Sequence, residues 1–165
     1  VVSHDNRLQV YDAAGALRWT SSETHGASNN FFGTLTSANN AVNSEKETTW
    51  VPTRIVIEDL DMDGINDVLV GGNRLETVTF MPNLRYFDGS SLSAFKWQGG
   101  AMTRLWETKK IPGYITNYQF VRPGKKGDQY QVLFAEAQTS YPFVFWNASA
   151  VYLNSYTLRV NSATK

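Results

Sequence analysis

Four aspartates within nine residues interrupt an apolar part of the chain, and they limit what this region can become. They occupy positions 1, 3, 5 and 9 of one loop: Asp59, Asp61, Asp63 and Asp67. No Lys or Arg lies between them in the sequence, so their negative charges repel one another unless a cation binds. Ca²⁺ takes about six to eight oxygen ligands, which alternating aspartates and a carbonyl at position 7, here Ile65, can supply. Gly64 at position 6 permits the sharp turn, so the pattern predicts a calcium loop.

The residues on either side of the loop decide which kind of calcium motif it can be. An EF-hand has a glutamate at position 12 and a helix on each side of its loop. Position 12 is Val70 in this chain, and residues 55–57 and 68–70 are β-branched or aliphatic. Such residues favour strands. The sequence therefore predicts two strands joined by a calcium loop and excludes the helical calcium motifs.

These residues resemble the FG-GAP/VCBS repeat, the calcium-carrying blade of integrin-α-like β-propellers. The hallmark of that family is an Asp-x-Asp-x-Asp-Gly-x-x-Asp loop followed by an apolar strand and a glycine, and residues 59–71 match it position by position. The integrin-type Phe-Gly…Gly-Ala-Pro signature is not evident, so the resemblance is to the bacterial VCBS side of the family. It implies calcium-binding propeller blades and a secreted or cell-surface protein.

Composition excludes several classes of partner. The 165-residue chain has 15 basic and 15 acidic residues and a formal net charge of zero, so no nucleic-acid partner is expected. It has no apolar run of about 18 residues, so we expect no membrane span. It has no cysteine, which excludes disulfides and thiol chemistry. Abundant aromatic residues without helical periodicity favour an all-β fold.

Alternating apolar and polar residues separated by turn residues predict a single all-β module over 1–165. Its predicted parts are an outer hairpin of one blade at 1–25, a Ser- and Asn-rich surface loop insertion at 26–49, a calcium-bearing blade at 50–110, and a degenerate blade without metal at 111–165. The turn-forming sequence Asp-Gly-Ser-Ser at 88–91 predicts a chain reversal within the calcium-bearing blade.

An internal repeat supports this division. A shift of 64 residues places Ile57 on Val121 and residues 68–70 on 132–134. The four aspartates then fall on Pro123, Lys125, Gly127 and Gln131, so the second copy has lost its metal ligands.

The predicted fold is therefore about two and a half four-stranded blades of β-propeller type. Closed propellers usually contain about four to eight blades, which leaves three alternatives: part of a larger propeller, a propeller completed by a second chain or copy, or a compact β-sandwich. Residues 8–11 and 151–160 are predicted to be exposed edge strands, which tend to recruit a partner.

Other candidate sites are weaker. His4 and His25 lie 21 residues apart in polar segments, and both are predicted to be at the surface. Glu76, Glu107 and Glu136 are carboxylates of the kind that glycosidases use, but nothing in the sequence sets their separation. We therefore assign no catalytic residue.

Exposed aromatic rings commonly stack on the apolar faces of sugars. Trp97 and Trp146 lie near predicted turns and are the candidate ligand-binding residues. Trp19 and Trp106 precede turns at equivalent places in two predicted blades and are expected to pack in the core.

The function expected from the sequence is a calcium-stabilised binding or adhesion module without catalysis. Its expected location is extracellular, at the cell surface or periplasmic, and its expected partner is a protein or glycan ligand, with self-association through the terminal strands as a further possibility. Two alternatives stay open: the propeller part of a secreted polysaccharide-degrading enzyme, and a structural subunit of a surface filament.

Overall fold

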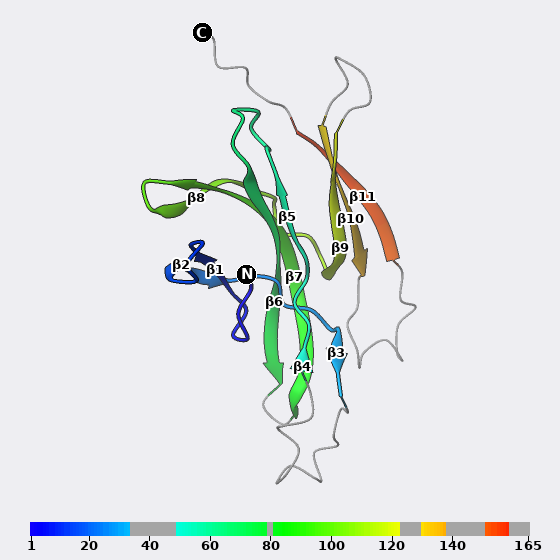
Figure 1. Cartoon of the computed structure of the whole chain (residues 1–165). Helices are drawn as coiled ribbons and strands as arrows, with labels where there is room; N and C mark the ends of the chain where they lie inside the picture. Colours follow the sequence, from blue (N-terminus) through cyan, green and yellow to red (C-terminus); the bar gives the residue numbers. More distant parts are fainter. Residues whose placement is uncertain (34–48, 79–80, 123–129, 138–150, 159–165) are drawn as a thin grey trace.

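The computed structural model describes residues 1–33, 49–78, 81–122, 130–137 and 151–158 (Figure 1). All regular structure in these residues is β-strand, so the all-β prediction is confirmed. Within these residues, no helix has the length and apolar character that crossing a membrane requires. Residues 143–146, whose sequence Phe-Val-Phe-Trp also predicts a strand, lie outside the described residues.

A four-stranded antiparallel sheet lies at the centre of the molecule (Figure 1). Its strands follow one another in chain order: β5 (Ile55–Glu58), β6 (Asp67–Val78), β7 (Met81–Gln98) and β8 (Ala101–Glu107). The aspartate loop joins β5 to β6, and Ile57 pairs with Val68 immediately beyond it. The predicted hairpin of two strands around this loop is therefore confirmed.

The reversal predicted at 88–91 is wrong, because these residues lie inside the 18-residue strand β7. Asp88 forms a β-bulge there, since Arg74 pairs with Gly89 while Leu75 pairs with Phe87. The Lys110 side chain crosses Gly89, and a Cβ at this position would require that flexible side chain to move. The chain instead reverses after β6, where Val78 pairs with Met81.

Two further β layers cover the central sheet, one on each face (Figure 1). One is a hairpin of β1 (Arg7–Tyr11) and β2 (Leu17–Thr24). The other is a three-stranded sheet of β9 (Tyr114–Val121), β10 (Tyr130–Ala137) and β11 (Val151–Leu158). A short hairpin of β3 (Phe31–Phe32) and β4 (Thr49–Trp50) completes the described strands.

The β9–β10 hairpin lies where the repeat predicted a second copy of the calcium hairpin, but its register differs by one residue. The shift of 64 residues predicts that Val121 pairs with Val132, whereas Val121 pairs with Gln131. Nine residues separate this pair, against ten between Ile57 and Val68.

Successive residues of β6 contribute to two separate cores because side chains of a strand alternate between faces. Leu69 belongs to the first core, between the central sheet and β9–β11, and Val70 belongs to the second core, between the central sheet and β1–β2. Both residues are fully buried. Trp106 packs against the first core and Trp19 against the second, which confirms the core role predicted for these two residues.

Buried polar contacts join the central sheet to β9. The Asn73 side chain on β6 donates to the carbonyls of Ala27 (2.7 Å) and Ile115 (2.9 Å) and accepts the Ile115 N–H (2.8 Å). The Tyr118 hydroxyl accepts the Gly71 N–H at 2.9 Å and donates to the Arg54 carbonyl. These contacts join four parts of the chain, namely β6, β9 and the segments that contain Ala27 and Arg54.

The start of the predicted surface loop at 26–49 is buried, unlike the expectation for a surface insertion. Gly26, Ala27 and Ser28 are all buried, and the Gly26 N–H donates to the Gly71 carbonyl at 2.6 Å. Thr53 N–H donates in turn to the Gly26 carbonyl at 2.7 Å. The segment is buried because its backbone completes hydrogen bonds with neighbouring strands.

The two predicted edge strands differ in how far their outer sides are paired. The outer side of β1 is partly covered, because Val2 forms a bridge with Leu8 and the Gln9 N–H donates to the Val1 carbonyl at 2.8 Å. Within the described residues, β11 pairs only with β10. Recruitment of a partner at the edges therefore stays a prediction, with β11 as the more open strand.

His25 is only 4% exposed, so the surface position predicted for it is wrong, whereas His4 is exposed as expected. The His25 ring meets Phe95 edge to face, with 5.3 Å between ring centroids, and burial lowers the pKa of the His25 imidazole. The folded state therefore favours neutral His25 more strongly than the unfolded state does.

We expect His25 to make folding stability fall as pH decreases. The pKa of His25 is lower in the folded state than in the unfolded state, so its contribution to stability is present at high pH. This contribution is lost as pH falls through the unfolded pKa toward the folded one. The free energy of unfolding then decreases by up to about 1.4 kcal/mol per pH unit. Urea unfolding at pH 7.5 and 5.5 should show a smaller loss in His25→Leu than in the unsubstituted protein. His4→Leu is the matched control, and equal losses in all three proteins would contradict the prediction.

Asn73→Ala should reduce the free energy of unfolding by about 2–4 kcal/mol, because it leaves two carbonyls and one N–H buried without a partner. Urea unfolding at neutral pH measures the change. Asn30→Ala, at an exposed position, controls for the loss of an amide as such. A loss below about 1 kcal/mol at Asn73 would show that water replaces the amide there.

Candidate metal centre

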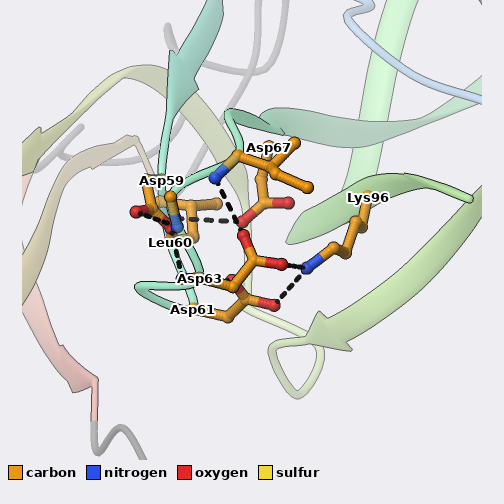
Figure 2. A network of polar contacts seen from close by, with 8 residues as sticks. Asp59, Leu60, Asp61, Asp63, Asp67 and Lys96 are labelled. Atoms are coloured by element: carbon orange, nitrogen blue, oxygen red, sulfur yellow. Dashed lines mark hydrogen bonds and ion pairs between the residues drawn. The ribbon is translucent and has the colours of Figure 1, made fainter.

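The aspartate loop is shaped by hydrogen bonds from its own backbone to its own carboxylates (Figure 2). The two Asp59 oxygens accept the N–H groups of Asp63 (3.1 Å) and Gly64 (3.0 Å), and Asp63 Oδ1 accepts the Ile65 N–H (2.9 Å). Met62 and Gly64 adopt positive φ values of 64° and 89°. Gly64 takes this conformation at little cost, as the sequence predicted.

Three of the predicted ligands converge. Asp59 follows β5, Asp61 lies in the loop and Asp67 begins β6, and one carboxylate oxygen from each lies within 4.8 Å of the other two. Three carboxylates this close together suit a hard cation with oxygen preference. The structure thus brings together three side chains that the sequence selected only by their spacing.

The burial and hydrogen bonding of Asp67 show whether these residues fit a metal ion. The residue is fully buried, and its Oδ2 accepts the Leu60 N–H at 3.0 Å. Its Oδ1 is also buried, and it has no hydrogen-bond partner in the described part of the chain. Burial raises the pKa of the Asp67 carboxyl, and the charge of Asp61 adds to this increase. A buried carboxylate oxygen without a partner, beside two further carboxylates, fits a cation ligand.

Asp63 is not part of the converging group, because its side chain points to Lys96 (Figure 2). Lys96 comes from β7, and its Nζ donates to Asp61 Oδ2 at 2.9 Å and to Asp63 Oδ2. The hydrogen bond from Lys96 is the main cause of a lowered pKa at Asp63, and the same contacts raise the pKa of Lys96. The loop therefore holds a cation supplied by the protein.

Lys96 is the residue that the sequence analysis missed. It lies 33 residues after Asp63 and reaches the loop through the pairing of β6 with β7, in which Phe95 lies opposite Val68. That pairing places the next residue, Lys96, beside the start of β6. Only knowledge of the strand register could have identified it.

Ile65 is the predicted carbonyl ligand at position 7. Its side chain is 55% exposed, as expected for a loop residue that contributes only its backbone. Its N–H is held by Asp63, which fixes the local chain direction. Its role as a ligand stays a prediction.

The structure describes only one of the two predicted ligand-binding tryptophans. Trp97 lies near the end of β7, opposite Met102, and is 39% exposed. Trp146 lies outside the described residues. An exposed ring at Trp97 is compatible with stacking on a ligand, and the paired site with Trp146 stays a prediction.

The three glutamates lie on different strands and have different surroundings. Glu76 is exposed on β6, whereas Glu107 on β8 binds Ser91 Oγ (2.7 Å) and Arg104 (3.0 Å). Glu136 on β10 is 9% exposed and accepts a hydrogen bond from Asn154 at 3.0 Å. These contacts are typical of structural carboxylates.

Comparisons of this chain with protein-family models, with curated proteins and with solved structures found no match.

Asp67→Asn should show how the burial of this carboxyl affects folding stability in metal-free protein. A raised folded pKa means that stability is greatest at low pH and is lost as pH rises through that pKa. In the presence of a chelator, the substituted protein should therefore be at least as stable as the original at pH 7, with an advantage that shrinks by pH 4. Asn can still accept the Leu60 N–H, and urea unfolding at both pH values measures the difference.

Asp12→Asn is a control in which the change in folding stability at pH 7 should have the opposite sign. Hydrogen bonds, first that from the Ala16 N–H, lower the pKa of Asp12, so its contribution is present at neutral pH and is lost as pH falls. The substitution should destabilise the protein at pH 7 and have little effect at low pH. A destabilising effect of Asp67→Asn at pH 7 without metal would contradict the role assigned to its burial.

Proposed function

We propose that this chain is a calcium-stabilised binding or adhesion module that acts at a cell surface or outside the cell and carries out no catalysis of its own. The observation that carries this proposal is the convergence of Asp59, Asp61 and Asp67 within 4.8 Å, with Asp67 Oδ1 buried and lacking a described partner. The resemblance of the loop to the FG-GAP/VCBS repeat supports the same ion.

The proposed ion has a structural role. Its side-chain ligands come from the residue after β5, from the loop and from the first residue of β6, so binding would fix the turn between two central strands. Ile65 would add its carbonyl, as the spacing of the loop predicts. An ion that binds only the folded state increases stability in proportion to the logarithm of its concentration above Kd.

The arrangement of the sheets supports a propeller-like assembly of blades. The central sheet is a four-stranded antiparallel meander, the usual form of a propeller blade. Further β layers pack on both of its faces, which is how neighbouring blades would contact it. We propose that β5–β8 is one blade, that β9–β11 belongs to the next, and that β1–β2 belongs to the one before.

A binding role is favoured over catalysis by what the polar groups contact. In the loop, the carboxylates of Asp59 and Asp63 accept backbone N–H groups, and Asp61 and Asp63 also bind Lys96. Trp97 offers an exposed ring to a protein or glycan ligand, because an aromatic face combines apolar area with a defined geometry.

Calcium at millimolar concentration should raise the free energy of unfolding by about 0.5–1.5 kcal/mol, as expected for a site with Kd near 10⁻⁴–10⁻³ M. This corresponds to a rise of a few degrees in the melting temperature of a chain of this size. Thermal melts in Ca²⁺ and in chelator measure it.

Two substitutions test whether this loop is responsible. Asp59→Asn should abolish the calcium response, whereas Asp5→Asn, which changes an exposed aspartate near the N-terminus, should preserve it. Identical melts of the unsubstituted protein with and without Ca²⁺ would overturn the proposed function. An undiminished response in Asp59→Asn would place the ion elsewhere.

A further inference from the structure

We propose that Lys96 is an internal counter-cation of the aspartate loop, which neutralises it in metal-free protein and competes with the divalent ion for Asp61. This inference rests on the proposed calcium site and assigns a different role to one of its predicted ligands. Asp63 would hold Lys96 beside the loop and would not itself be a ligand of the ion.

The position of Lys96 is set by the sheet. The pairing of Phe95 with Val68 places Lys96 beside the start of β6, and its side chain is only 16% exposed. The aliphatic part of the side chain is thus largely covered, while its ammonium group reaches the two loop carboxylates (Figure 2). A lysine held in this way loses less freedom on pairing than one at an open surface.

Asp61 is the point of competition. It contributes an oxygen to the converging group with Asp59 and Asp67, and its Oδ2 also accepts a hydrogen bond from Lys96 Nζ at 2.9 Å. A divalent ion at the convergence point and the ammonium group would draw on the same carboxylate. Two cations near one carboxylate also repel each other, so each weakens the binding of the other.

Asp63 contacts only one of the two cations. It lies outside the converging group, but it binds Lys96 and accepts the Ile65 N–H. When Asp61 turns toward the ion, Asp63 can still retain the ammonium group. This arrangement predicts that Lys96 stays near the loop in both states and that its charge lowers the affinity for calcium permanently.

The consequence is a loop that folds without metal and binds it reversibly. Four carboxylates within nine residues would repel one another strongly if no cation were present. Lys96 reduces this repulsion in metal-free protein, and by the same charge it makes the ion's additional contribution smaller. Loss of Lys96 should therefore increase both the affinity for calcium and the dependence of folding on it.

The test compares Lys96→Met with the unsubstituted protein by calorimetric titration with Ca²⁺ and by luminescence of bound Tb³⁺. We expect the Kd for Ca²⁺ to fall by about tenfold or more, because one positive charge close to the ion is removed. In chelator, the melting temperature of Lys96→Met should fall below that of the original protein, and saturating Ca²⁺ should restore most of the loss.

Three further variants separate charge from packing. Lys110→Met removes the same side chain from an ion pair with Asp88 (2.9 Å) outside the aspartate loop and should leave the Kd unchanged. Lys96→Arg keeps the charge and should retain weak binding. Asp63→Asn keeps a group that can accept the Ile65 N–H, and it should retain ion binding if Asp63 is only the anchor of Lys96.

The outcomes distinguish this inference from the proposed function. If neither the original protein nor Lys96→Met binds Ca²⁺ or Tb³⁺, the calcium site and this inference both fail. If both bind with the same Kd, the calcium site stands and the role of Lys96 is overturned. Weaker binding by Lys96→Met than by the original protein would also overturn the role of Lys96. If only Lys96→Met binds, the lysine has replaced the metal, which supports the inference and overturns calcium stabilisation of the natural chain. If Lys96→Met folds only in Ca²⁺, its calcium-dependent folding supports the inference.

Discussion

Residues 69–71 of strand β6 are buried on both faces of the central sheet, and this burial determines how the other elements are arranged. Leu69 and Val70 are fully buried in opposite directions, so the strand needs a β layer on each side. Its next residues are equally constrained, because Gly71 must admit the Tyr118 ring, whose Cε1 would lie 3.0 Å from an added Cβ. Asn73 then joins β6 to Ile115 of β9 through paired hydrogen bonds. Apolar packing and polar contacts therefore fix the same strand.

The aspartate loop takes its chemical properties from its connection to this strand. Asp67 is both the last aspartate of the loop and the first residue of β6, so the packing that buries β6 also removes Asp67 from water. A carboxylate in such a position is unfavourable unless a cation or hydrogen-bond donor compensates for the lost hydration. One oxygen has the Leu60 N–H, and the other has no described partner. The electrostatic cost at this end of the sheet therefore comes from the burial of Asp67 in the core as much as from the number of aspartates.

The same sheet also supplies a cation of its own, because the pairing of β6 with β7 brings Lys96 to the loop. The proposed ion and Lys96 would both offset the negative charge of this loop, and Asp61 is the carboxylate that both would contact. If the proposed ion binds, the relative strength of these two interactions would set how far the fold depends on calcium. A structural ion that competed with Lys96 would suit a module whose stability varies with the calcium concentration around it.

Local sequence was enough to predict the features that depend on neighbouring residues. β-branched and aliphatic residues predicted the strands on both sides of the loop, and the spacing of the aspartates selected four side chains, of which Asp59, Asp61 and Asp67 converge in the structure. Three features depend on how the strands pair and pack and could not be predicted locally: residues 88–91 continue a strand, His25 is buried, and Lys96 binds Asp61 and Asp63. The reason is physical: backbone conformation and loop geometry follow from local sterics, whereas burial and ion pairing depend on which strands lie side by side. Lys96 and Asp63 are 33 residues apart, and no local pattern contains their contact.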